Sequence, residues 1–156
     1  MGDIDEPDIL PLNPDLDGPS IRPGVVAVIA VGGALGVAAR YGIGHALPTS
    51  AGAFPWATFW INVSGSFVLG VFMVIVFERL GSTRYLRPFF GTGFIGAFTT
   101  FSTFAVETDL LIKDGHAGTA AAYVASTLVV GLLCAWLGIN VGRQLPGRAH
   151  HQIGPT

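Results

Sequence analysis

Four long apolar stretches alternate with short polar segments along the chain, at about 24–46, 55–77, 87–112 and 117–141. Each is as long as the roughly 20 predominantly apolar residues that a helix needs to cross the hydrocarbon core of a bilayer. The composition agrees, because 51% of the residues are hydrophobic, 12% are charged and the mean hydropathy is +0.60, whereas about a quarter of the residues of a soluble domain are charged. The pattern predicts an all-α membrane protein with four transmembrane helices in residues 23–142.

Polar residues recur along one face of the second predicted helix. Thr58, Asn62 and Ser66 are spaced at i, i+4 and i+8, which places their side chains on the same face. An amide buried in lipid needs hydrogen-bond partners. Two interpretations of Asn62 are therefore open: it holds the helices together by an interhelical hydrogen bond, or it donates to a desolvated anion that moves along this face.

The third stretch contains more glycine than a stable membrane helix favours. Gly91, Gly93 and Gly96 each cost about 1 kcal/mol relative to alanine in a helix interior, and they follow one another closely in this stretch, which weakens the helix there. We expect a break from Gly96 to Thr99. A break at membrane depth frees backbone carbonyls, which must be buried in protein or bound to something, and neutral carbonyls suit a monovalent cation.

Aromatic rings alternate with hydroxyls after the expected break. The positive edge of an aromatic ring can face an anion, and the alternation leaves no wholly apolar face. Glu107 follows one turn beyond Thr103. A carboxylate inside a membrane span indicates function by default, although one near the end of a span can also reach water. The rings belong to Phe98, Phe101 and Phe104, and the hydroxyls belong to Thr100, Ser102 and Thr103.

The first predicted helix carries one charge and a pair of small residues. Gly32 and Gly36 form a small-xxx-small pair, which permits close packing of helices within one chain or between chains. Arg40 lies late in this helix, where an unpaired cation is costly. It either extends to the interface, forms a structural ion pair or attracts anions at the mouth of a pore.

The fourth predicted helix offers a second row of hydroxyls. Tyr123 and Thr127 are one turn apart, and Gly131 follows after another turn. Taken alone, this spacing is more typical of ordinary helix packing.

Both ends of the chain differ from its apolar centre. The first 22 residues hold six of the ten acidic residues and four of the ten prolines, which predicts a disordered tail, and residues 143–156 form a second, short tail. With four spans, six of the eight basic residues lie on the side of the two termini, which favours cytoplasmic termini and insertion in the cell membrane. These six are Arg22, Arg79, Arg84, Arg87, Arg143 and Arg148.

Three motifs together resemble the CrcB/Fluc family of fluoride channels. They are Gly32 to Gly36 with Arg40-Tyr41, the stretch Asn62 to Phe67, and Gly93 to Phe104 followed by Glu107. The resemblance covers about residues 32–142. It implies a dimer of four-helix subunits inserted antiparallel to one another, with a broken third helix in each and two fluoride pores along the subunit interface.

The resemblance also implies roles for single residues. A sodium ion that is not transported would be held at the dimer centre by the backbone carbonyls of Gly96 and Thr99. The anion path would include Phe101 and Phe104 as pore phenylalanines and Asn62 as the polar amide. Charged positions typical of the family correspond to Arg40 and Glu107, and the hydroxyl track would comprise Thr58, Ser102, Thr103, Tyr123 and Thr127. Because Gly131 stands where some relatives have a hydroxyl, the track is expected to be shorter here.

Fluoride is a small and strong hydrogen-bond acceptor, so a narrow pore must replace its water with donors. We therefore expect a passive channel that exports fluoride and lowers its cytoplasmic concentration, with no enzymatic activity and no nucleic-acid partner. The charge bias favours pairing with an oppositely oriented paralogue, and a homodimer of dual topology is the other option. Two further alternatives are a proton-coupled small multidrug transporter, disfavoured because the first span lacks an acidic residue, and a non-conducting assembly subunit.

Overall fold

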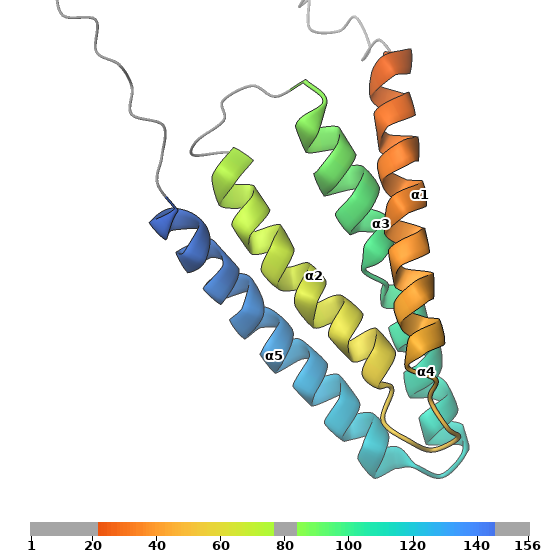
Figure 1. The fold of residues 1–156 in the computed structure, drawn as a ribbon. Helices are drawn as coiled ribbons and strands as arrows, with labels where there is room; N and C mark the ends of the chain where they lie inside the picture. Colours follow the sequence, from red (N-terminus) through yellow and green to blue (C-terminus); the bar gives the residue numbers. More distant parts are fainter. Residues whose placement is uncertain (1–21, 77–83, 146–156) are drawn as a thin grey trace, which may run out of the picture.

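A computed structural model describes residues 22–76 and 84–145 (Figure 1). Residues 1–21 and 146–156 of the two terminal tails, the charges of Arg79 and Arg148, and the end of the second predicted span lie outside the described residues. The described part is helical and contains no strand. Its helices are α1 (Pro23–Ala46), α2 (Trp56–Val74), the π-helix η3 (Pro88–Ile95), α3 (Gly96–Phe98), α4 (Phe101–Lys113) and α5 (Ala117–Gln144).

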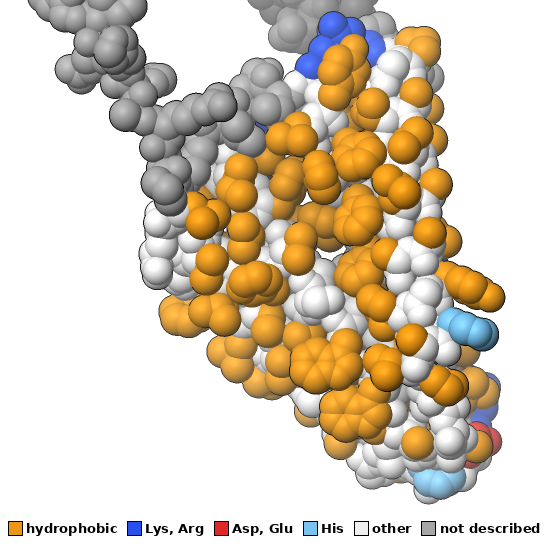
Figure 2. Space-filling model, in the orientation of Figure 1, with side chains coloured by type: hydrophobic (Ala, Val, Ile, Leu, Met, Phe, Trp, Pro, Cys, Tyr) orange, Lys and Arg blue, Asp and Glu red, His pale blue; other side chains and the backbone are white. Residues whose placement is uncertain are grey.

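Four helical segments of the described residues are long and apolar enough to cross a membrane. They have mean hydropathies of 1.4 to 2.0 and span Pro23–Ala46, Trp56–Val74, Pro88–Lys113 and Ala117–Gln144. Large apolar side chains point outward, as Leu132 (73% exposed) and Trp136 (64% exposed) do on α5, and Figure 2 shows such side chains covering the middle of one face. Since water would oppose this arrangement and lipid favours it, the chain is an all-α membrane protein with the four predicted spans.

Glycines let the helices approach closely. A Cβ atom at Gly70 of α2 would clash with the Ala135 carbonyl of α5, and one at Gly36 of α1 would clash with the Phe94 carbonyl of η3. Helix association in lipid depends on such close packing, because the hydrophobic effect contributes little there. Gly32 likewise lies against the Phe89 carbonyl, so the Gly32 and Gly36 pair packs α1 against η3 within the chain.

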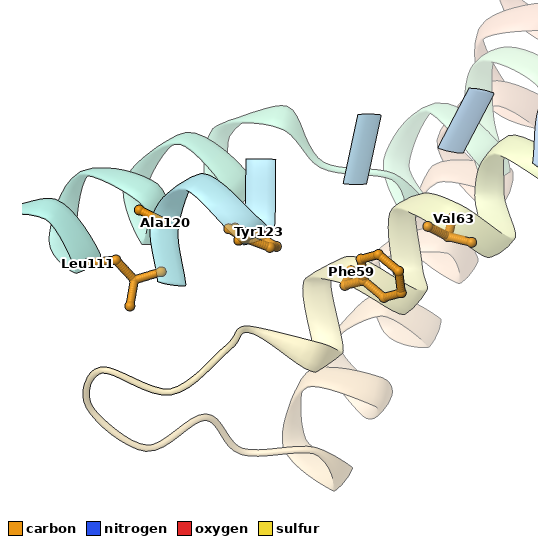
Figure 3. Packing of buried hydrophobic residues seen from close by; sticks show 5 residues of the cluster. All are labelled: Phe59, Val63, Leu111, Ala120 and Tyr123. Carbon is orange, nitrogen blue, oxygen red and sulfur yellow. The ribbon is translucent and has the colours of Figure 1, made fainter. Parts of the chain in front are cut away.

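A small apolar core lies where α2, α4 and α5 meet. It consists of side chains from these three helices: Phe59, Val63, Leu111, Ala120 and Tyr123 (Figure 3). The tight turn between α4 and α5 supports it, because Gly115 adopts φ = +82°, a conformation that residues with a Cβ atom rarely adopt. The core fixes the relative positions of α4 and α5 on one side of the helix break.

The third span is broken, as the sequence predicts, but the break lies slightly later. Gly96 remains helical, with φ = −61° and ψ = −30°, whereas Thr99 and Thr100 are extended, with ψ values of 154° and 119°. The hydroxyl of Thr100 accepts a hydrogen bond from the Thr103 N–H at 3.2 Å, and so caps the N-terminus of α4. A threonine that starts a new helix thus places the break at Thr99–Thr100.

The described basic residues are distributed unequally between the two ends of the helices. Arg22 precedes α1, Arg84 and Arg87 precede η3, and Arg143 lies in the last turn of α5. All four belong to one end of the bundle, whereas Lys113 closes α4 at the other end, where the α1–α2 and α4–α5 connections lie (Figure 1). The fold therefore places these residues on the sides that the sequence predicts.

Candidate functional site

The amide of Asn62 bridges α2 and the helix break. Its Oδ1 accepts from the Thr100 N–H at 2.9 Å, and its Nδ2 donates to the Thr100 carbonyl at 3.0 Å. These two bonds satisfy backbone groups that the break removes from the helical pattern. The first interpretation of Asn62, an interhelical hydrogen bond, is therefore confirmed. The amide nitrogen carries two hydrogens, and the bond to the Thr100 carbonyl uses only one of them.

A cavity of about 300 Å³ adjoins this amide. Hydroxyl, amide and aromatic side chains from α2, the break, α4 and α5 form its wall, together with two leucines. We refer to it as the Asn62 cavity. Its lining comprises Asn62, Gly65, Ser66, Leu69, Thr99, Thr100, Phe101, Phe104, Thr127 and Leu128.

The Thr127 hydroxyl is buried and, among the described residues, has no hydrogen-bond partner. A buried hydroxyl without a partner costs about 1–3 kcal/mol, so its persistence calls for an explanation. Because Thr127 borders the Asn62 cavity, a guest in that cavity is a natural partner. The predicted position of Thr127 on the polar face of the fourth helix fits this arrangement.

Glu107 accepts two hydroxyl hydrogen bonds from other helices. Thr58 of α2 donates to Oε1 at 2.9 Å, and Tyr123 of α5 donates to Oε2 at 2.8 Å. Both donors are buried, Tyr123 completely. The carboxylate is thus held inside the protein by two protein hydroxyls, and this three-helix contact is what the sequence pattern did not predict.

A second cavity, of about 350 Å³, contains both charged residues predicted for the site. We call it the Glu107 cavity; its wall includes Arg40, Thr58, Thr100, Thr103 and Glu107. Arg40 is half-buried and forms no salt bridge within the described part of the chain. Of the three interpretations of Arg40, a structural ion pair is not found among the described residues, and Arg40 lies on the wall of the partly open Glu107 cavity.

Neighbouring cavities share lining residues. Thr100 borders both the Asn62 cavity and the Glu107 cavity. Glu107 and Thr49 also border a third cavity of about 340 Å³, next to the α1–α2 loop and Asp114. The Glu107 cavity thus shares a wall residue with the Asn62 cavity and two wall residues with the third cavity.

The two predicted pore phenylalanines both border the Asn62 cavity, at different depths. Phe104 is half-buried, and its ring lies 5.0 Å from that of Tyr123. Phe101 is 80% exposed, and the two phenylalanine rings are 6.0 Å apart. Phe101 therefore contributes an exposed wall to the Asn62 cavity.

The other predicted hydroxyls lie around the start of α4. Thr103 accepts from the Thr100 hydroxyl at 2.9 Å and borders the Glu107 cavity. Ser102 is exposed and approaches the Thr100 hydroxyl at 3.4 Å, but it is not among the residues lining either cavity. The predicted track thus divides into three groups: Thr58, Thr103 and Thr127 lie on the cavity walls, Tyr123 is fully buried and lines neither cavity, and Ser102 lies on the outer surface.

Two backbone carbonyls at the break lose their usual donors. In a continuous helix the Thr100 N–H would donate to the Gly96 carbonyl and the Thr103 N–H to the Thr99 carbonyl. Here the Thr100 N–H donates to Asn62 Oδ1, and the Thr103 N–H donates to the Thr100 hydroxyl. The described residues contain no group of three or more His, Cys, Asp or Glu side chains that could hold a metal ion.

Thr100 and Ser66 line the Asn62 cavity, although the sequence analysis does not place them in the site. Ser66 carried a signal, since it is one turn beyond Asn62 on the same face. Thr100 did not, because its role depends on being the first residue after the break.

Comparisons with known proteins agree with this geometry. Residues 27–139 match the family described as "CrcB-like protein, Camphor Resistance (CrcB)". The chain is 48% identical over 128 residues to Fluoride-specific ion channel FluC 3 of Streptomyces avermitilis and 54% identical over 104 residues to FluC 2 of the same organism, covering 82% and 67% of this chain. It is 49% identical over 121 residues to Fluoride-specific ion channel FluC 1 of Streptomyces coelicolor, covering 78% of this chain and 79% of that relative.

The chain spans 63% and 66% of the length of the two Streptomyces avermitilis relatives. The family match covers more than half of this chain and includes every residue assigned to the two cavities and to the break. The break in the third span and the Asn62 contact across it lie at the centre of the matched region. On these grounds, the chain belongs to the CrcB/Fluc family.

Proposed function

We propose that this protein is a fluoride-selective passive anion channel that exports fluoride and lowers its concentration in the cytoplasm. The observation that carries the proposal is the Asn62 cavity, where an unpartnered buried hydroxyl, an amide and two aromatic rings converge. The names of the relatives support the choice of ion, because all three are fluoride-specific ion channels.

Fluoride fits this lining for chemical reasons. It is small and accepts hydrogen bonds strongly, so it gains from the Asn62 amide, the Thr127 hydroxyl and the positive edges of Phe101 and Phe104. Chloride is larger and a weaker acceptor, and it gains less from the same donors. Arg40 beside the Glu107 cavity adds a positive charge that favours entry of an anion.

Efflux from liposomes tests the proposal. Full-length protein reconstituted in sodium buffer is expected to release fluoride, followed with a fluoride-selective electrode, while chloride is retained. The rate is expected to be the same with and without an imposed pH difference, because a passive channel needs no coupling ion. Efflux that requires the pH difference would favour the proton-coupled transporter, and no efflux from well-reconstituted protein would refute the channel.

The helix break is proposed to hold a structural sodium ion through the carbonyls of Gly96 and Thr99. Two observations support the fit: both carbonyls lack their helical donors, and Gly96 is exposed on the surface of the subunit. Unwound backbone carbonyls are ligands that suit Na⁺ in membrane proteins. When bound, sodium would supply the positive charge that balances these carbonyl dipoles, and the residues of this chain would supply its ligands and shield it from lipid.

Replacing sodium with a large organic cation such as N-methyl-D-glucamine on both sides of the liposome is expected to reduce fluoride efflux at least about tenfold, equivalent to roughly 1.4 kcal/mol. A cation too large for the break cannot use its carbonyls. Potassium at equal ionic strength provides the control for general salt effects. An unchanged efflux rate in the organic cation would contradict the sodium proposal while leaving the channel proposal intact.

Two subunits are proposed to assemble antiparallel, with the exposed Phe101 and Gly96 facing the partner. The unequal distribution of arginine supports insertion with cytoplasmic termini and an oppositely oriented paralogue as partner. Tags at both termini, labelled from each side of the membrane, distinguish the options. Equal labelling from the two sides would overturn the fixed orientation and support a homodimer of dual topology.

A further inference from the structure

Ser66, on the wall of the Asn62 cavity, lies opposite Gly131 of α5. Ser66 lies one turn beyond Asn62 on α2, and it borders the same cavity as Asn62 and Thr127. Gly131 lies one turn beyond Thr127 on α5. A Cβ atom at Gly131 would lie 3.7 Å from Ser66 Oγ, so the serine hydroxyl stands opposite the one position where the polar row of α5 has no side chain.

The two helices hold this arrangement firmly. α2 packs along α5 (Figure 1), and Gly70 and Gly138 bring their backbones into contact. Because residues four apart share a helix face, Asn62 and Ser66 form one row that lies beside the row of Thr127 and Gly131. At the level of the glycine, α2 alone supplies a hydroxyl.

Ser64, two residues before Ser66, shows the usual hydrogen bonding of a serine in a membrane helix. Ser64 donates to the Trp60 carbonyl of its own helix at 2.6 Å, the usual way in which a serine hydroxyl is satisfied in a helix. For Ser66 Oγ, the described residues provide no such bond within helix α2. Its side chain instead borders the Asn62 cavity, whose wall also contains the apolar side chains of Leu69 and Leu128.

We infer that Ser66 extends the anion path beyond Thr127 by donating its hydroxyl to the passing ion, in place of a side chain on α5 at Gly131. The inference rests on the proposed fluoride channel and assigns one further specificity-determining residue to it. Without the Ser66 hydroxyl, the cavity wall that also includes Leu69 and Leu128 would lose one hydrogen-bond donor. A serine provides one O–H donor and suits a strong acceptor such as fluoride.

Fluoride efflux from liposomes carrying the full-length Ser66→Ala variant is expected to fall about three- to tenfold, as the loss of one hydrogen bond predicts. Adding Gly131→Ser should restore the rate to within about twofold of the wild-type rate, because the new side chain fits opposite residue 66 and returns a hydroxyl to that level. The matched control, Gly131→Ala in the same background, adds a methyl group without a hydroxyl and should not restore it. Ser64→Ala should leave the rate unchanged.

Two results would overturn the inference: a wild-type rate for Ser66→Ala, or equal recovery with Gly131→Ala and Gly131→Ser, which would indicate a packing role. If Ser66→Ala does not reconstitute, Ser66→Cys keeps a similar size with a weaker donor, and the same pair of Gly131 variants is compared in that background. The failure of the channel proposal itself would look different, because the wild-type protein would then release no fluoride.

Discussion

Replacing Asn62 with alanine is expected to lower fluoride efflux at least about 100-fold, which corresponds to roughly 2.7 kcal/mol. The change leaves the N–H and carbonyl of Thr100 without their partners, and Thr100 is buried. Each unsatisfied buried group costs about 1–3 kcal/mol. The break that shapes the Asn62 cavity loses its anchor, and the cavity loses its amide donor.

A matched asparagine provides the control. Asn140 donates to the Trp136 carbonyl at 2.8 Å within α5, away from the cavities, so Asn140→Ala is expected to leave efflux within about twofold of the wild-type rate. Chromatographic elution and thermal stability in detergent show whether each variant folds. A folded Asn62→Ala protein that retains the wild-type efflux rate would contradict the role assigned to this residue.

Replacing Phe101 with leucine is expected to reduce fluoride efflux at least about tenfold, or roughly 1.4 kcal/mol, with little effect on the stability of the isolated subunit. The ring is 80% exposed in one subunit, so its loss removes little packing there. Leucine keeps an apolar side chain but has no ring edge with positive character. The expected loss of transport therefore reports on the aromatic ring and not on hydrophobic contact.

Leu132→Ala is the control for an exposed apolar residue, because Leu132 is 73% exposed on α5 and is not among the residues lining the Asn62 or Glu107 cavities. Its efflux rate is expected to match that of the wild-type protein. Chemical crosslinking of both variants shows whether the subunits still associate. Wild-type efflux from Phe101→Leu would exclude the ring as part of the path.

The spans and the existence of the break could be predicted from sequence because they depend on local properties. Apolar length sets the spans, and the glycine content near Gly96 weakens the third helix. The predicted position of the break was less accurate, because glycines allow a helix to break but do not determine at which residue it breaks. The extended residues Thr99 and Thr100 are stabilised by Asn62, which lies 38 residues from Thr100 in the chain.

The contacts of the site depend on which helix faces meet, and a single sequence does not determine that. Spacing placed Thr58 and Asn62 on one face of α2, and the structure confirms that both face the site. The meeting of Thr58 and Tyr123 at Glu107 joins three helices and could not be predicted from the periodicity of any one. The groups that Arg40 contacts likewise could not be predicted from the sequence, because an arginine near a helix end can reach either solvent or a cavity.

The chain of cavities also explains why Glu107 is compatible with an anion path. Its carboxylate already accepts hydrogen bonds from Thr58 and Tyr123, so these hydroxyls are held in place when no ion is near. In the proposed channel, a passing anion would compete with the carboxylate for the same donors, and Arg40 on the wall of the same cavity would offset the negative charge. A fixed acceptor thus keeps the donors oriented within the membrane.

The reversal potential of currents across a planar bilayer tests the central claim most directly. With a fluoride gradient across the reconstituted protein and equal, high chloride on both sides, the current is expected to reverse at the equilibrium potential of fluoride. That result requires passive conduction and selectivity for fluoride at once. Reversal near zero, as a chloride-permeable pore would give, or the absence of any protein-dependent current would contradict the account.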